Sequence, residues 1–322
     1  DLQLQSALQV TETATMAEPA GKIGIIGSGL IGQQWAMLFS SGGFEVVMYD
    51  KDKNALAAAL PKIEKQFSDL SKNNRLRPSP LTAAQQLQRI SVTDSLDACV
   101  SGCTYIQECV PESLELKEAV MKSLDSVISP SCVVGSSTST FKPSLFTSKC
   151  DKRARMVVAH PVNPPYYLRL VEVVPAPWTD ADAVDLCVSL MRQIGQAPVK
   201  MSREVDGFSL NRIQYAILNE VWHQVDQGLI SPADIDVVMK EGLGPRYALM
   251  GPLETIHLNA HGVRDYLQKY SKSILAVSQT LDAPVLMDPE SKTASVLQSH
   301  LEKEIPLEAL GERTAWRNLK LA

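Results

Sequence analysis

The sequence predicts an α/β fold in which a doubly wound, mostly parallel sheet is followed by an all-helical C-terminal domain. From residue 22 onward, short apolar runs rich in β-branched residues alternate with stretches of helical periodicity. A glycine-rich turn follows the first of these runs, and no convincing strand follows about Met201. Strands that alternate with helices in this way indicate a parallel sheet covered by helices on both faces.

The elements of the sheet domain are expected in a regular order along the chain. Strands are predicted at 22–26, 45–49, 105–108, 132–135, 156–159 and 170–174. Helices are predicted from near Ile31, over 52–74, over 112–127 and over a stretch that ends near Ile194, before Gly195. Thr179 and Asp182 have the spacing of a capping box for that last helix. A long helical pattern at 208–227 belongs to the second domain.

Length and composition suggest two domains of ordinary globular character. The chain has 322 residues, of which 45% are hydrophobic and 21% are charged. The expected boundaries place the sheet domain at 22–201 and the helical domain at 202–322. Residues 1–21 contain neither a basic residue nor a long apolar core. They are therefore expected to form a flexible polar tail rather than a signal peptide.

Charge and cysteine content argue against several classes of protein. The net charge of -5 gives no electrostatic reason to expect nucleic-acid binding. No apolar run approaches the roughly 20 residues needed to cross a bilayer. The six cysteines show neither a C-x-x-C pair nor a histidine at metal-binding spacing. We expect a cytoplasmic protein with reduced thiols, no bound metal and no membrane attachment.

The glycine-rich turn is the first motif that indicates a ligand. It follows a predicted strand, opens a predicted helix and consists of Gly27, Ser28, Gly29, Leu30, Ile31 and Gly32. In a Rossmann-type domain the first glycine of this pattern allows a tight turn, the second lets the backbone approach a pyrophosphate, and the third allows close packing of helix and strand. The helix N-terminus then offers free N–H groups to the phosphates. The alternative is a glycine-rich turn that binds nothing.

Asp50 indicates which dinucleotide the glycine-rich turn is expected to bind. It ends the second predicted strand, about 20 residues beyond the glycines, where an acidic residue accepts hydrogen bonds from the adenosine ribose. A carboxylate there would repel a 2'-phosphate, so NAD is favoured over NADP. Glu108 ends another predicted strand and is also expected to face the cofactor, unless it is only a solvated carboxylate.

His160 and Glu172 are the second informative pair. Glu172 lies in an otherwise apolar strand, where an unpaired carboxylate would cost several kcal/mol. His160 ends the preceding strand, so the two side chains meet if the strands are neighbours. Glu172 would then hold Nδ1–H and leave Nε2 free to act as a general base for a hydroxyl substrate. The alternative is a purely structural hydrogen bond.

Four segments carry a resemblance to a known family. His160-Pro-Val-Asn-Pro-Pro-Tyr166 followed by Leu170-Val-Glu172 is similar to the active-site segment of the 3-hydroxyacyl-CoA dehydrogenase family, and the segments at 106–112, 135–140 and 241–254 add to it. The resemblance implies that His160 is the base and Glu172 its partner. It implies that Ser139 hydrogen-bonds the reacting oxygen, a role that Ser137 or Thr138 could share, and that Asn163 and Asn211 position substrate and nicotinamide. It also implies a homodimer formed through the helical domain.

Arg246 is the expected clue to the substrate. A guanidinium can hold a carboxylate through two parallel hydrogen bonds, whereas an acyl-CoA hides its carboxyl in a thioester. Members of the family that act on free 3-hydroxy acids resemble this chain in carrying an arginine there, which implies a substrate such as L-gulonate. Three alternatives remain: a structural role for Arg246, a 3-hydroxyacyl-CoA substrate held by the basic residues Lys62, Lys65, Lys72, Arg75 and Arg77, or a structural lens protein that retains NAD binding.

Overall fold

The computed structural model describes residues 20–321 and divides into two compact units. One contains the chain up to Phe208 together with the residues from Asn318, and the other contains Ser209–Arg317. The division lies slightly beyond the expected boundary at 201. The expected tail at 1–21 lies outside the described residues except for its last two, and Ala20 donates its N–H to the carbonyl of Gly43 at 3.0 Å.

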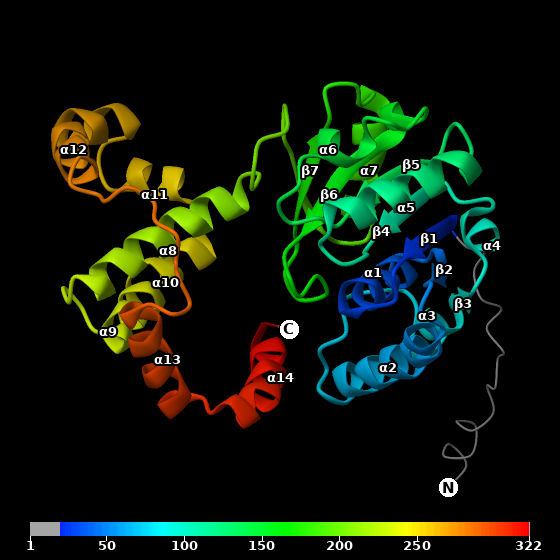
Figure 1. The fold of residues 1–322 in the computed structure, drawn as a ribbon, viewed down its shortest axis with the longest axis horizontal. Coiled ribbons are helices and arrows are strands. Elements are labelled where there is room, and N and C mark those ends of the chain that lie inside the picture. The colour runs from blue at the N-terminus through cyan, green and yellow to red at the C-terminus, as the bar shows by residue number, and fades with distance from the viewer. Residues whose placement is uncertain (1–19, 322) are drawn as a thin grey trace, which may run out of the picture. The chain divides into compact units, whose positions relative to one another are not determined.

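The first unit is an α/β domain built on one eight-stranded sheet (Figure 1). Its elements are β1 (Lys22–Ile26), α1 (Leu30–Ser41), β2 (Glu45–Tyr49), α2 (Lys53–Lys72), α3 (Ala83–Gln88), β3 (Ile90–Thr93), α4 (Leu96–Val100), β4 (Tyr105–Glu108), α5 (Leu114–Val127), β5 (Val133–Ser136), α6 (Pro143–Thr147), the 3-10 turn η1 (Arg153–Arg155), β6 (Met156–Pro161), β7 (Leu170–Pro175), α7 (Ala181–Gln193) and β8 (Ala197–Lys200). The strand order is β3-β2-β1-β4-β5-β6-β7-β8, and all neighbours are parallel except β6 and β7. This is the doubly wound Rossmann arrangement that the sequence predicts.

Two apolar clusters hold helices against the two faces of the sheet. On one face Trp35 and Phe39 of α1 pack with Ile63 of α2 and Met191 of α7. On the other face Met121 of α5 and Phe146 of α6 pack with α4. Both faces are therefore covered, which explains why residues 23–26 of β1 and 156–159 of β6 are continuous apolar runs rather than alternating ones.

The structure contains elements that the sequence pattern does not predict, among them the short helices α3, α4 and α6. Strands β3 and β8 were not predicted, and β6 continues through His160 to Pro161, so the histidine lies inside the strand. The capping box predicted for α7 is wrong, because the N-cap is Asp180 and its side chain makes no capping bond. Thr179 instead donates its hydroxyl to the carbonyl of Met156 and accepts the N–H of Ala176, both at 2.9 Å.

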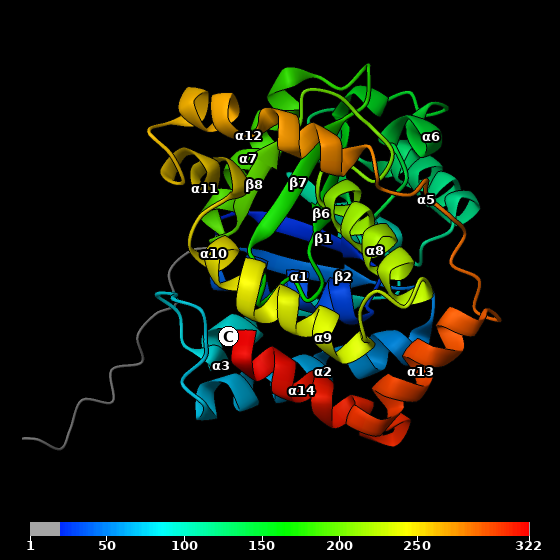
Figure 2. The same ribbon diagram turned by 90° about the vertical axis from the view of Figure 1, so that its left-hand side faces the viewer.

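The described residues of the second unit form helices and the loops between them, without a strand (Figure 2). It contains α8 (Leu210–Asp226), α9 (Pro232–Val237), the π-helix η2 (Val238–Leu243), α10 (Gly244–Leu249), α11 (Pro252–Leu258), α12 (Val263–Ser278), α13 (Lys292–Glu304), the 3-10 turn η3 (Leu307–Ala309) and most of α14 (Leu310–Leu321). Several of its helices, including α12, bury no residue. Among residues 20–321, no helix is long and apolar enough to cross a membrane.

Candidate active site

A cavity of about 1010 Å³ lies at the carboxyl ends of the parallel strands. Its walls come from the turn after β1, the end of β2, the segment after β4, α5 and the loop after β5. Ligands of doubly wound sheets bind at this edge, where the strand order reverses, here between β1 and β4. The cavity is therefore where a dinucleotide is expected.

The glycine turn shapes the cavity through three different constraints. Gly27 has φ +103°, and a Cβ on it would lie 2.7 Å from the carbonyl oxygen of Cys109. A Cβ on Gly32 would lie 1.9 Å from the carbonyl oxygen of Gly27, so only glycine lets α1 pack this closely on β1. No heavy atom lies within 4 Å of a Cβ placed on Gly29, whose backbone faces open space at the start of α1. The turn thus leaves room for phosphates beside free N–H groups.

Not every residue of the turn reaches the cavity. Gly27, Gly29, Leu30 and Ile31 line it, whereas Ser28 and Gly32 do not. Ser28 is buried, and both its N–H and its hydroxyl donate to Oδ2 of Asp50, at 2.7 and 2.8 Å. Direct contact of these two residues with a ligand stays a prediction; in the structure Ser28 orients Asp50, and Gly32 lets the helix pack close to the strand.

Asp50 lies at the cavity wall as predicted. Its Oδ1 accepts the N–H of Asp52 at 2.9 Å, and its Oδ2 faces Ser28, so the carboxylate is fixed by its neighbours. Each carboxylate oxygen can accept more than one hydrogen bond, which leaves capacity for ribose hydroxyls. Together with the open backbone at Gly29, this donor and acceptor set fits NAD. No group of ligands able to hold a metal ion occurs among residues 20–321.

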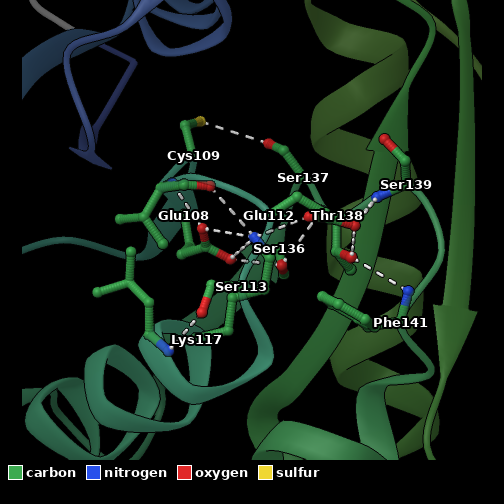
Figure 3. Close-up of polar contacts among 12 residues, drawn as sticks. Glu108, Cys109, Glu112, Ser113, Lys117, Ser136, Ser137, Thr138, Ser139 and Phe141 are labelled. Atoms are coloured by element: carbon green, nitrogen blue, oxygen red, sulfur yellow. Dashed lines mark hydrogen bonds and ion pairs between the residues drawn. The ribbon is translucent and has the colours of Figure 1, made fainter.

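Glu108 does not face the cofactor cavity, which corrects the expectation from sequence. Its side chain is fully buried and forms an ion pair with Nζ of Lys117 at 3.0 Å (Figure 3). It also accepts the N–H of Val110 at 2.6 Å and the hydroxyl of Ser136 at 2.5 Å. The buried charge is thus neutralised and hydrogen-bonded, as a buried charge must be. The pair ties α5 to the ends of β4 and β5.

Glu112 lines the cavity instead of Glu108, and no local sequence pattern distinguishes it from other surface acids. Its Oε1 accepts the hydroxyl of Thr138 at 2.6 Å and the N–H of Ser139 at 3.0 Å, and its Oε2 lies 3.4 Å from Nζ of Lys117 (Figure 3). Burial raises the pKa of Glu112, but these hydrogen bonds and the lysine charge outweigh burial and hold it below its ordinary value. Glu112 therefore stays ionised and fixes the loop after β5.

The three hydroxyl residues of that loop have different environments. Thr138 is fully buried and its hydroxyl is committed to Glu112, so it does not reach a ligand. Ser137 and Ser139 both line the cavity, as does Asn163 in the loop after β6. Arg77 anchors that second loop, since its Nε donates to the carbonyl of Tyr166 at 2.7 Å.

His160 and Glu172 meet as the strand pattern predicts. They are directly opposite each other in the antiparallel β6–β7 ladder, and Nδ1 of His160 lies 2.8 Å from Oε2 of Glu172. Both side chains are buried, and the imidazole packs against the ring of Phe208 with 5.5 Å between centroids. The contact occupies Nδ1 and leaves Nε2 as the nitrogen available for proton transfer.

Asn211 and Arg246 belong to the second unit. Asn211 is buried in the first turn of α8. Arg246 is exposed in α10, directly after the π-helix η2, and its Nε donates to the carbonyl of Gly242 at 3.4 Å. The guanidinium therefore has N–H groups beyond this long local bond.

The fold and the cavity define an NAD-dependent dehydrogenase with a Rossmann domain and a helical domain. Residues 22–205 match the NAD-binding domain of 3-hydroxyacyl-CoA dehydrogenase, and residues 207–289 match its C-terminal domain. The chain belongs to the 3-hydroxyacyl-CoA dehydrogenase family.

Individual relatives and solved structures agree with this assignment. The chain is 45% identical to the rabbit protein lambda-crystallin (Oryctolagus cuniculus) over 94% of this chain and 95% of the relative. It is 32% identical to L-carnitine dehydrogenase of Bacillus cereus, covering 82% and 80% of the two chains. The crystal structure of FHMPC 5-dehydrogenase, an NAD+-dependent dismutase, is 27% identical with a TM-score of 0.78, covering 93% and 96% of the two chains.

Proposed function

We propose that this protein oxidises the 3-hydroxyl of a small free hydroxy acid with NAD, and that L-gulonate is a substrate. The observation that carries the chemistry is the 2.8 Å contact between His160 and Glu172 in a buried strand pair. A buried imidazole whose Nδ1 faces a carboxylate is oriented, and its positive form is stabilised once it takes a proton.

Each residue of the site has its own role in the proposed reaction. Nε2 of His160 removes the proton of the substrate hydroxyl, and Glu172 stabilises the imidazolium that results. The hydroxyl of Ser139 donates to the reacting oxygen, and Asn163 and Asn211 align the substrate. NAD, when bound, supplies the acceptor for the hydride that leaves the carbinol carbon.

Arg246 favours a substrate with a free carboxylate, because its guanidinium could bind that group. Its guanidinium is exposed, and its Nε donates a long hydrogen bond of 3.4 Å to the carbonyl of Gly242. It follows a π-helix, a distortion that occurs often at functional sites. A planar guanidinium pairs with a carboxylate through two parallel N–H···O bonds, which a lysine cannot reproduce. The similarity to L-carnitine dehydrogenase, whose substrate is a free 3-hydroxy acid, agrees with this choice.

The basic residues considered for CoA binding give weaker support to an acyl-CoA substrate. Arg77 is turned into the protein and donates to the carbonyl of Tyr166 and to Gln196, and burial lowers its pKa to about 10. Lys65 forms an ion pair with Asp69 within α2 at 3.1 Å. The Arg77 guanidinium is thus turned inward and the Lys65 charge is paired, whereas Lys62, Lys72 and Arg75 are exposed, so a comparison of substrates has to decide against the acyl-CoA alternative.

A substrate comparison tests the proposal. NADH formation would be followed with L-gulonate, L-carnitine and 3-hydroxybutyryl-CoA, for the unmodified protein and for Arg246→Lys. We expect turnover of a free hydroxy acid, with KM raised about 10-fold or more in the variant because the bidentate contact is lost. Turnover of the CoA ester alone would overturn the choice of substrate, and NAD binding without turnover of any hydroxyl compound would favour a structural protein.

We also propose that the helical unit pairs with a second copy of itself. It leaves large apolar side chains exposed, among them Leu249 at 84% and Leu286 at 90%, and α12 buries none of its residues. Apolar surface of this extent marks an interface in most soluble proteins. Sedimentation should give twice the chain mass, and Ile274→Glu with Leu275→Glu on α12 should give the single mass. A monomeric unmodified protein would contradict the pairing.

A further inference from the structure

Ser137 is held by a buried polar chain that the mechanism above does not use. It follows β5 directly and lines the cavity beside Cys109, which follows β4 (Figure 3). Two donors reach its hydroxyl oxygen: Nε1–H of Trp35 at 3.2 Å and Nε2–H of Gln107 at 2.7 Å. Trp35 and Gln107 are both fully buried.

The orientation of the Gln107 amide is set by its other partners. The carbonyl of Ala159 can only accept, so the Gln107 atom 3.3 Å from it is the amide nitrogen, and Oε1 accordingly accepts the hydroxyl of Tyr105 at 2.5 Å. Gly135 makes the arrangement possible, because a Cβ there would lie 2.0 Å from the Tyr105 hydroxyl oxygen. The chain Tyr105–Gln107–Ser137 therefore runs through the core in one direction, from donor to acceptor.

The two donors fix what Ser137 can still do. A hydroxyl has two lone pairs and one proton, and both lone pairs of Ser137 face N–H groups. Only its proton remains, and the nearest acceptor is the sulfur of Cys109 at 3.3 Å. Burial raises the pKa of Cys109, so this sulfur belongs to a neutral thiol, which is a weak acceptor. Ser137 can therefore act only as a hydrogen-bond donor at the cavity wall. A stronger acceptor could take the place of the Cys109 thiol as its partner.

We propose that Ser137 binds the cofactor by donating its hydroxyl proton to the carbonyl oxygen of the nicotinamide carboxamide. The strand order supports this assignment. Asp50 ends β2, the glycine turn follows β1, and Ser137 lies two strands further, between them and the strand of His160. A dinucleotide with its adenosine ribose at Asp50 and its phosphates at the glycine turn brings its nicotinamide to that side. Trp35, Gln107 and Tyr105 act as positioning residues, since they touch Ser137 or each other and not the cavity.

The test separates the nicotinamide from the rest of the cofactor. Dissociation constants would be measured for NADH and for ADP-ribose, which has the same adenosine, phosphates and riboses but no nicotinamide. For Ser137→Ala we expect NADH to bind about 3- to 10-fold more weakly, the factor for one neutral hydrogen bond, with ADP-ribose affinity unchanged. The inference rests on the placement of the nicotinamide beside His160, but a binding measurement does not depend on which hydroxy acid is oxidised.

A second variant guards against loss of folding. Ser137→Ala leaves two buried N–H groups without an acceptor, whereas Trp35→Phe keeps the Ser137 hydroxyl and removes one of its two donors. The smaller phenyl ring leaves a void in the core, so ADP-ribose binding also reports whether the unit remains folded. Trp35→Phe should weaken NADH binding about 2-fold and leave ADP-ribose binding unchanged. Ser126→Ala removes an exposed hydroxyl that donates to a carbonyl of α5 and serves as the control. Equal losses for both ligands, or no loss for NADH in either variant, would overturn the assignment.

Discussion

Nδ1 of His160 lies 2.8 Å from Oε2 of Glu172 across the only antiparallel pair of the described sheet. Antiparallel pairing places the two residues directly opposite each other, and burial of both keeps water from competing for the contact. Glu172→Gln should lower kcat by roughly 10²-fold or more while the dissociation constant for NADH stays nearly unchanged. A glutamine carries no charge to stabilise the imidazolium, and its amide can donate to Nδ1 and so move the proton to Nε2. Steady-state rates and fluorescence titration with NADH would measure both quantities, and an unchanged kcat would mean that the contact is structural.

His160→Ala should have the larger effect on chemistry and as little effect on cofactor binding. General bases contribute about 10²- to 10⁴-fold to the rate, so kcat should fall by a factor in that range. The proposed partner of His160 is the substrate hydroxyl rather than the cofactor, so NADH should bind with nearly normal affinity. A matching loss of NADH affinity, or normal turnover, would remove His160 from the role of base.

The parts of the site that the sequence could predict are those with a local pattern. The glycine turn, Asp50 at a strand end and a carboxylate within an apolar strand are each visible within a few residues. The His160–Glu172 pair needed only the assumption that two consecutive strands are neighbours, and the register bears that out.

The parts that could not be predicted depend on contacts between distant segments. Lys117 neutralises Glu108 only because α5 folds back over β4, and Arg77 reaches Tyr166 across 89 residues of chain. Strand β8 is a short edge strand with a proline and exposed residues, so its pattern resembles a loop. A strand-end glutamate such as Glu108 looks identical from sequence whether it faces a ligand or a buried lysine.

Asp50 should determine the choice between NAD and NADP. Asp50→Asn keeps an oxygen for the Ser28 N–H but removes the charge that repels a 2'-phosphate. Binding of NADH should weaken by about 5- to 10-fold, because hydrogen bonds to a charged acceptor are stronger than those to a neutral one, and NADPH should bind more tightly. The ratio of the two dissociation constants is the measurement. Asp94→Asn, which removes an exposed charge paired with Lys53, is the control and should leave the ratio unchanged.

Glu112 should make the stability of the nucleotide-binding unit depend on pH. Its pKa in the folded protein lies below the ordinary value of 4.5, because hydrogen bonds from Thr138 and Ser139 and the charge of Lys117 outweigh burial. A depressed pKa means that the carboxylate stabilises the fold above its unfolded pKa, and that this contribution is lost as pH falls through the folded pKa. Glu112→Gln should therefore lower the free energy of unfolding at pH 7 by about 1 kcal/mol, a figure reduced for partial exposure.

The same difference should shrink when unfolding is measured in urea at about pH 3.5, below the ordinary pKa of glutamate. Glu115→Gln, at an exposed position in the first turn of α5, is the control and should lower stability by less than about 0.5 kcal/mol at either pH. A deficit in Glu112→Gln that is equally large at both pH values would show that its carboxylate charge does not hold the loop. The hydrogen bonds from Thr138 and Ser139 would then stabilise the loop through an uncharged side-chain oxygen of residue 112.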